Sequence, residues 1–147
     1  MKAFRFRLDQ ALRWRRAQAD QLRAKAAAAA DRISVLSADL EARERTLHSD
    51  AESLTQRPDS EGLQNWAAYM RRVKREKTDV EKRLREAERL LGEQIRLLVE
   101  ANRKVRLLDK LREKAAQQWN ADMQRELEAF ANDAFLGRLQ SRENSGA

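Results

Sequence analysis

The sequence predicts an all-α fold, a long antiparallel two-helix coiled-coil hairpin with a helical overhang at its C-terminal end. Three observations predict it. Of the 147 residues, 37% are charged and 5% are aromatic, a balance typical of long helices and coiled coils. Apolar residues recur every seven positions in two long stretches, which keeps one face of a helix turned toward a partner. The only proline lies between the two stretches.

The first helix is expected over about residues 5–56. One row of residues spaced by seven is apolar throughout, and a second row is apolar at most of its early positions. We call the positions in these rows the seam, because they are expected to face the second helix. Arg15, Arg43 and Asp50 interrupt the second row. The apolar seam positions are Leu12, Ala19, Ala26, Ile33, Leu40, Leu47 and Leu54 in the first row and Leu8, Leu22, Ala29 and Leu36 in the second.

A turn is expected at residues 57–61. Pro58 lacks a backbone donor and restricts Arg57, so the first helix should end near that point. Asp59 or Ser60 is a suitable N-cap, because its side-chain oxygen can accept from the free N–H groups that open a second helix. The chain should therefore fold back on itself here.

The second helix is expected over about residues 60–139, with a disordered tail at 141–147. Its seam is interrupted by Lys77, Gln94 and Arg112, and its phase slips by about one residue after Trp119, which resembles a stutter. The seam positions are Leu63, Met70, Leu84, Leu91, Leu98, Val105 and Trp119 in one row, Trp66, Val73, Val80, Ala87, Ala101, Leu108 and Ala115 in the other, and Met123, Leu127, Phe130 and Ala134 after the slip.

Pairing the two seams predicts a single hairpin domain in which Ile33 lies near Ala87 and Leu8 near Leu111. Small residues at 26–30 would then face Ala87 and Gly92, forming a thin waist. The second helix is the longer one, so residues from about 115 onward should project without a partner in the chain. An overhang bearing Trp119, Met123, Leu127 and Phe130 is expected to bind another protein.

The net charge of +7 is concentrated at the N-terminal end. Positions 1–25 contain eight Lys or Arg residues and only two Asp residues. Such a surface can hold nucleic-acid phosphates, lie on an anionic membrane or dock an acidic protein, and it can also be an ordinary solvated face. Seam leucines among the cations favour a protein partner and no nucleic acid. The candidate partner-binding cations are Arg5, Arg7, Arg13, Arg15 and Arg16.

Catalytic and cofactor-binding residues are not expected. Cysteine is absent and His48 is the only histidine, so we expect neither a metal site nor a nucleophile with its base. No stretch approaches the ~18 apolar residues that would suggest a bilayer span, and no signal peptide is recognisable. We therefore expect a soluble, cytoplasmic protein that is not an enzyme.

The start of the second helix is a second candidate surface. Trp66 and Val73 fit the seam, so core packing is their default role. Tyr69 falls outside the seam, and an exposed aromatic residue beside a turn is a suitable recognition anchor.

Four stretches of the sequence follow one another in a characteristic order. They are Phe4-Arg5-Phe6-Arg7-Leu8 before an arginine-rich helix, Asn65-Trp66-Ala67-Ala68-Tyr69 after the turn, Leu108-Asp109-Lys110-Leu111-Arg112-Glu113-Lys114, and the series Trp119, Arg125, Glu126, Glu128 and Asp133. In this order and spacing they resemble the FliJ family, the stalk proteins of the bacterial flagellar export apparatus. The resemblance covers essentially the whole length. Arg72 stands where the family has an aromatic residue.

This resemblance implies an antiparallel coiled coil that inserts its termini into a hexameric export ATPase and contacts the cytoplasmic domain of the export gate and the export chaperones. It implies a role in flagellum biogenesis and motility, and a peripheral place at the inner face of the cell membrane. Under this hypothesis the ATPase-binding residues are the N-terminal cations with Trp119, Met123, Leu127 and Phe130, and the gate-binding residues are Trp66, Tyr69 and Val73.

The expected state is a monomeric hairpin. A virulence-type secretion stalk protein, a self-associating structural coiled coil and a nucleic-acid-associated helical protein remain the alternatives.

Overall fold

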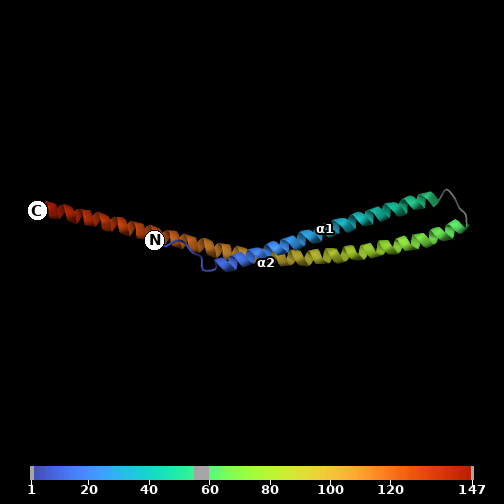
Figure 1. The fold of residues 1–147 in the computed structure, drawn as a ribbon, viewed down its shortest axis with the longest axis horizontal. Helices are drawn as coiled ribbons and strands as arrows, with labels where there is room; N and C mark the ends of the chain where they lie inside the picture. The colour runs from blue at the N-terminus through green and yellow to red at the C-terminus, as the bar shows by residue number, and fades with distance from the viewer. Residues whose placement is uncertain (1, 55–59, 147) are drawn as a thin grey trace. The chain divides into compact units, whose positions relative to one another are not determined.

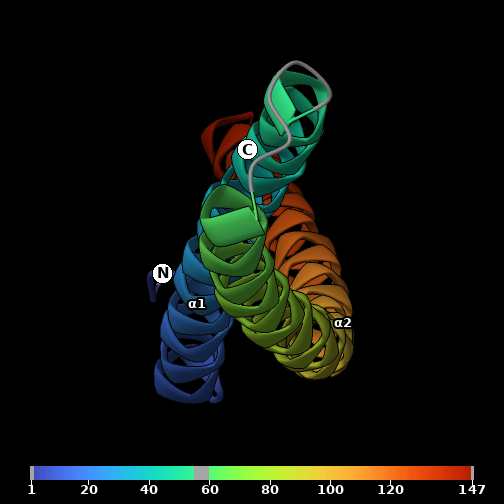
Figure 2. The ribbon, with the colours of Figure 1, turned by 90° about the vertical axis from the view of Figure 1, so that its right-hand side faces the viewer.

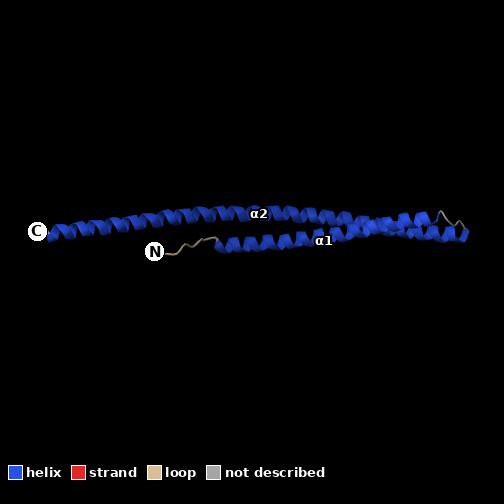
Figure 3. Cartoon of the chain, turned by 90° about the horizontal axis from the view of Figure 1, so that it is seen from above, coloured by secondary structure: helices blue, strands red, loops and turns tan. Residues whose placement is uncertain are grey.

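The computed structural model describes residues 2–54 and 60–146, and these form two long helices (Figure 1). Helix α1 spans Asp9–Leu54 and helix α2 spans Ser60–Ser145. The described residues contain no strand (Figure 3). The predicted fold class, a hairpin of two long contacting helices, is confirmed. Within the described residues, neither helix has a stretch that is both long and apolar enough to cross a membrane.

The helix ends differ from the predicted ones. Helix α1 begins at Asp9 and not near residue 5, since residues 2–6 are not helical. A turn leads into the helix, in which the backbone N–H of Asp9 donates to the Phe6 carbonyl at 3.1 Å. Asp9 then places a carboxylate in the first turn, where the helix dipole favours it. Of the predicted turn, residues 57–59 lie outside the described residues, and Ser60 and Glu61 already belong to α2.

The tail predicted to be disordered is instead helical as far as Ser145. Arg142 lies in the last turn of α2, and its carbonyl accepts from the Gly146 N–H at 3.0 Å and from the Ser145 hydroxyl at 3.2 Å. These two bonds satisfy the Arg142 carbonyl, one of those that a helix end can leave open. The sequence of this tail contains no proline, and a basic residue near the helix C-terminus interacts favourably with the dipole.

The helices contact each other in two compact units, each containing part of both. Unit 1 comprises Met1–Ala17 and Ala101–Ala147, and unit 2 comprises Gln18–Glu100. In unit 2 the pairing is antiparallel, since Arg43 bonds to Glu76 and Asp50 to Tyr69. Figure 2 shows the last turns of α1 and the first turns of α2 together, both facing the viewer.

The predicted seam is the core of both units. Every described residue that is buried and apolar occupies a predicted seam position, and no described polar or charged residue is buried. Near the turn the seam is looser than predicted, because Leu63 is 43% exposed and residues 61–65 are all exposed. The buried residues are Ala19, Val73, Val80 and Ala87 in unit 2 and Leu12 and Ala101 in unit 1.

The predicted waist is only partly correct. Ala87 is buried, whereas Gly92 is exposed and a Cβ atom added to it would meet no atom within 4 Å. Gly92 therefore takes no part in a close approach of the two backbones. A two-helix layer with alanines in its seam buries little apolar area, so each large seam residue contributes a large share of the stability.

Candidate functional site

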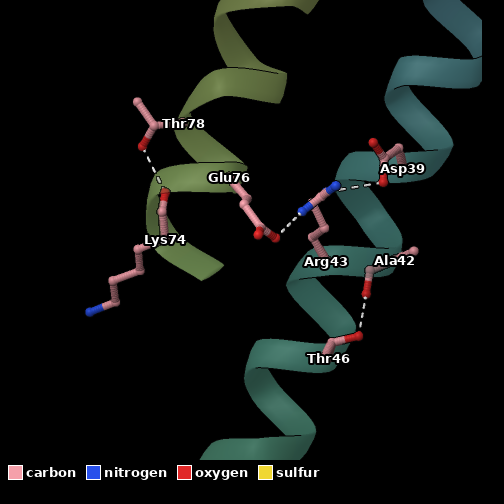
Figure 4. Close-up of polar contacts among 7 residues, drawn as sticks. All are labelled: Asp39, Ala42, Arg43, Thr46, Lys74, Glu76 and Thr78. Atoms are coloured by element: carbon pink, nitrogen blue, oxygen red, sulfur yellow. Dashed lines mark hydrogen bonds and ion pairs between the residues drawn. The ribbon is translucent and has the colours of Figure 1, made fainter. Parts of the chain in front are cut away.

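The charged residues that interrupt the seam in unit 2 are paired across the two helices. Arg43 donates to Glu76 Oε2 at 2.7 Å and to Asp39 Oδ1 at 3.1 Å (Figure 4). The hydrogen bond to Glu76 is the main cause that raises the pKa of Arg43. Lys77 Nζ lies 3.5 Å from Glu44 Oε1 in the same part of the hairpin. These pairs fix the register of α1 on α2 without opening a site for a ligand.

The gate-binding candidates lie in unit 2 and differ in accessibility. Val73 is only 7% exposed, so its side chain is committed to the core. Trp66 is partly buried, and its Nε1 finds no hydrogen-bond partner among the described residues. That nitrogen is itself buried, so its N–H is not accessible at the surface.

Tyr69 was predicted to be an exposed anchor, and the structure corrects this. It is partly buried, and a hydrogen bond from its hydroxyl to Asp50 of α1 raises the pKa of the phenol. The Arg72 guanidinium lies over the ring, 5.6 Å from its centroid, which is within the range of a cation–π contact. Arg72 thus covers the ring, and Tyr69 joins the two helices.

In unit 1 the N-terminal residues 2–6 run beside α2 and cover Trp119. The Phe4 and Trp119 ring centroids are 6.1 Å apart with planes inclined by 60°, and Trp119 Nε1 donates to the Lys2 carbonyl at 3.2 Å. We call residues 2–6 the arm, which Figures 1 and 3 show beside α2. The predicted unpartnered region therefore starts later than residue 115, since Trp119 is covered.

A groove of about 390 Å³ follows directly after the arm, lined by Lys2, Trp119, Asp122, Met123 and Glu126. Beyond it all described residues from 124 to 146 are exposed, and α2 continues alone past the arm in Figures 1 and 3. We call residues 124–146 the bare segment. Its large apolar side chains, with their exposed fractions, are Leu127 (49%), Phe130 (74%), Phe135 (61%), Leu136 (56%) and Leu139 (41%).

The five candidate arginines are not equally available. Arg13 pairs with Asp9 at 3.1 Å and Arg16 with Asp109 of α2 at 2.7 Å. Arg15 occupies a seam position, and its guanidinium lies 4.8 Å from the centroid of the Trp14 ring. Arg5 and Arg7 are exposed on the chain before α1. Arg5 and Arg7 are therefore the most accessible of the five to a partner.

The sequence reasoning missed the cations that α2 adds to this surface. Residues 2–17 and 101–117 together contain twelve Lys or Arg and three Asp or Glu, whereas Gln18–Glu100 contains sixteen of each. The predicted hairpin already places these two stretches side by side. Summing the charges of both stretches would therefore have revealed the excess of basic residues. The basic residues that α2 contributes are Arg103, Lys104, Arg106, Lys110, Arg112 and Lys114.

Within the described residues, no cluster of three or more His, Cys, Asp or Glu side chains could hold a metal ion. His48 lies beside Glu52 at 3.4 Å on an exposed face of α1. The side chains of unit 1 present exposed apolar residues and a surplus of positive charge.

Comparison of the chain with protein-family models, with curated proteins and with solved structures found no match.

Proposed function

We propose that this chain is a non-enzymatic stalk protein of the bacterial flagellar export apparatus, acting in the cytoplasm at the inner face of the cell membrane. In this role unit 1 binds a hexameric export ATPase, and residues of unit 2 contact the cytoplasmic domain of the export gate. Export chaperones are further partners. The proposal combines the resemblance to the FliJ family with the geometry of the two units.

The bare segment is the observation that carries the proposal. It holds 23 residues, from 124 to 146, of which all but the last belong to α2, and five of its large apolar side chains are at least 41% exposed. At roughly 1.5 to 3 kcal/mol for each large apolar side chain removed from water, a host that encloses this helix gains several kcal/mol before ordering costs. A helix of this kind is suited to the interior of a ring.

The exposed arginines of unit 1 support the same partner. Arg5 and Arg7 lie in or next to the arm, in the unit that also holds the bare segment. Cations around an apolar anchor raise the association rate with an acidic lining and make the binding sensitive to salt. Trp119 and Met123 then act at the edge of this contact, beside the arm.

The gate contact is proposed for Trp66 and Tyr69 alone. Val73 is withdrawn from it, because a side chain that is 7% exposed has little surface to offer. Trp66 and Tyr69 are both only partly buried, so each keeps some side-chain surface for a partner. Both residues stand on the first turns of α2 that contact α1.

The experiment compares two faces of the bare segment. Residues 127 and 130 continue the seam, whereas 135 and 139 are centred about 130° away from them around the helix, at 100° per residue. The double change Leu127→Ala and Phe130→Ala should weaken binding to the purified ATPase by about ten-fold or more. The matched change Phe135→Ala and Leu139→Ala should have a smaller effect. Equal loss with both variants would argue against an oriented contact, and no loss with either would refute the proposal.

A self-associating structural coiled coil is the second candidate, and the same bare segment supports it. Two copies could cover each other's apolar side chains in place of a ring. Sedimentation equilibrium distinguishes the two, because the stalk proposal requires a monomer at micromolar concentration. A virulence-type secretion stalk, whose architecture is the same, is a further alternative.

A further inference from the structure

We propose that one side of unit 1 is a docking surface for an amphipathic helix with acidic flanks. The surface is formed by Trp14 of α1 with Leu107 and Leu111 of α2, bordered by lysines. It lies outside the bare segment and uses none of the residues that we assign to the ATPase. It therefore adds a second binding surface to the proposed function and does not depend on it.

The apolar part of the surface consists of three large side chains that stay about half exposed or more, one of which, Trp14, also has the Arg15 guanidinium 4.8 Å from its ring centroid. Trp14 is 57% exposed, Leu107 58% and Leu111 48%. Leu107 and Leu111 are four residues apart, so they are neighbours on one face of α2. Nothing in the pairing of α1 with α2 requires large apolar residues at these positions.

The pair Arg16–Asp109 places Trp14 next to this face. It fixes the antiparallel register in unit 1 with a contact of 2.7 Å. Trp14 is two residues before Arg16 and Leu111 is two residues after Asp109, so they stand at the same level. A step of two residues turns the side chain by about 200°, which moves both to the side of the helix pair opposite the ion pair.

Three lysines border the apolar strip. Lys104 and Lys110 are three residues from Leu107, and Lys114 is three residues from Leu111, so each is a neighbour of a leucine on the helix surface. All three are exposed, and none forms an ion pair within the part of the chain that the structure describes. Of the three acidic residues in this region, Asp9 and Asp109 already pair with arginines.

Charge complementarity identifies the partner as acidic. Residues 2–17 and 101–117 carry twelve basic and three acidic side chains, while Gln18–Glu100 has equal numbers of both. The excess of basic over acidic side chains is therefore found in this region and not in Gln18–Glu100. A partner that carries carboxylates would be attracted to this region. Lysine is a suitable residue for this, because its stem can cover the partner's apolar surface while its charge meets the acid.

The shape of the strip identifies the partner as a helix. Helix α2 carries apolar residues at its two seam positions and, with Leu111, at a third position beside them, as helices do when they pack against two neighbours. A helix lying along the pair contacts Trp14 of α1 and Leu107 of α2 at once. An anionic bilayer or a nucleic-acid backbone could pair with the lysines. Neither would offer a narrow apolar surface that packs against Trp14, Leu107 and Leu111.

The test uses the full-length protein and a capped peptide of about 18 residues, five turns of helix. The peptide carries leucines at i, i+3, i+4 and i+7 with glutamates beside them. Its control has the same composition in an order that removes the stripe. Binding is measured by fluorescence anisotropy of the labelled peptide at two salt concentrations. Vesicles containing anionic lipid and a short DNA duplex are titrated as competitors.

Matched variants locate the site. Leu107→Ala with Leu111→Ala should weaken peptide binding by about ten-fold or more, because two large apolar contacts are lost. Leu90→Ala with Leu97→Ala is the control, since these leucines are 39% and 41% exposed in the charge-balanced unit 2. Lys104→Glu with Lys114→Glu should also weaken binding and reduce its dependence on salt. Alanine and glutamate are good helix formers, and circular dichroism checks that each variant keeps its helix content.

The proposal stands if the striped peptide binds, the scrambled one does not, and only the unit 1 variants reduce affinity. It is overturned if both peptides bind alike, if the control pair of leucines matters as much, or if vesicles or DNA displace the striped peptide at lower concentration than unlabelled peptide does. Absence of binding by the striped peptide also overturns it. None of these outcomes changes the ATPase experiment, which depends on the bare segment.

Discussion

The Phe4 ring stands against the Trp119 ring at a centroid distance of 6.1 Å, although 115 residues separate them in sequence. The indole of Trp119 also donates to the Lys2 carbonyl. This contact marks where intrachain cover ends along α2, because Trp119 is covered and all described residues from 124 to 146 are exposed. The arm thereby sets the length of the segment left for a partner.

Removing the Phe4 ring should uncover Trp119. In a Trp14→Phe, Trp66→Phe background, Trp119 is the only remaining one of the three tryptophans, so its emission can be read directly. We expect Phe4→Ala to shift that emission to the red and to increase quenching by acrylamide, because the ring contact is lost. The change Phe135→Ala, on the bare segment, should leave the emission as it was. An unchanged spectrum in the Phe4 variant would mean that the arm does not cover Trp119 in solution.

Replacing Gly92 should stabilise unit 2. A Cβ atom at this position meets nothing within 4 Å, and the residue lies in the interior of α2. Gly92→Ala should therefore raise the free energy of unfolding by about 1 kcal/mol, measured by urea denaturation followed by circular dichroism. Gly137 has the same open surroundings but lies in the bare segment, so Gly137→Ala should raise helix content with less effect on the unfolding midpoint. A lower midpoint for Gly92→Ala would show that the backbone packs closely there.

The only tyrosine in the chain allows its titration to be followed without interference from others. The hydrogen bond to Asp50 raises the pKa of Tyr69 above the usual value of about 10. The folded state thus holds this proton more tightly than the unfolded state. Its contribution to stability is present below the unfolded pKa and is lost as pH rises through the folded pKa.

Absorbance of the tyrosinate provides the measurement. We expect a midpoint above that of a model tyrosine, and Asp50→Asn should bring it back toward the ordinary value. Tyr69→Phe should remove this part of the alkaline loss of stability. If Asp50→Asn leaves the midpoint where it is, the contact between Tyr69 and α1 is absent in solution.

Binding of the ATPase should depend on the two exposed arginines. Arg5→Glu with Arg7→Glu should weaken the complex in low salt and much less in high salt, because screening reduces interactions between exposed charges. Arg83→Glu with Arg85→Glu, in the charge-balanced unit 2, is the control. Surface plasmon resonance at several salt concentrations measures both. A loss of affinity that is equal for the two variants would assign the effect to net charge and exclude a local contact.

The periodicity of the sequence predicted the fold because burial follows it. Leu12, Val73 and Val80 are buried at positions chosen from spacing alone, since a seam of two helices needs one apolar face and little else. Arg43 and Lys77 also occupy seam positions, and their partners Glu76 and Glu44 come from the facing helix. Such pairs cannot be assigned until the register is known.

The candidate surfaces were predicted less well, because they depend on contacts between distant residues. Nothing local in the sequence indicates that Phe4 reaches Trp119 or that Asp50 holds Tyr69. Val73 was offered as a binding residue although its spacing already placed it in the core. The cations of α2 were missed because charge was counted along the chain and not across the hairpin.

The central claim is that α1 folds back along α2 within one molecule, and a distance measurement tests it most directly. The chain has no cysteine, so spin labels can be attached at Arg32→Cys and Glu88→Cys, two exposed positions in unit 2 that the register brings level. With the labelled chain diluted in unlabelled protein, pulsed electron resonance should give a distance of about 20 to 30 Å, from helix axes about 10 Å apart plus two label linkers. A distance near the ~84 Å that 56 residues of continuous helix would span, or no short distance at all, would contradict the hairpin.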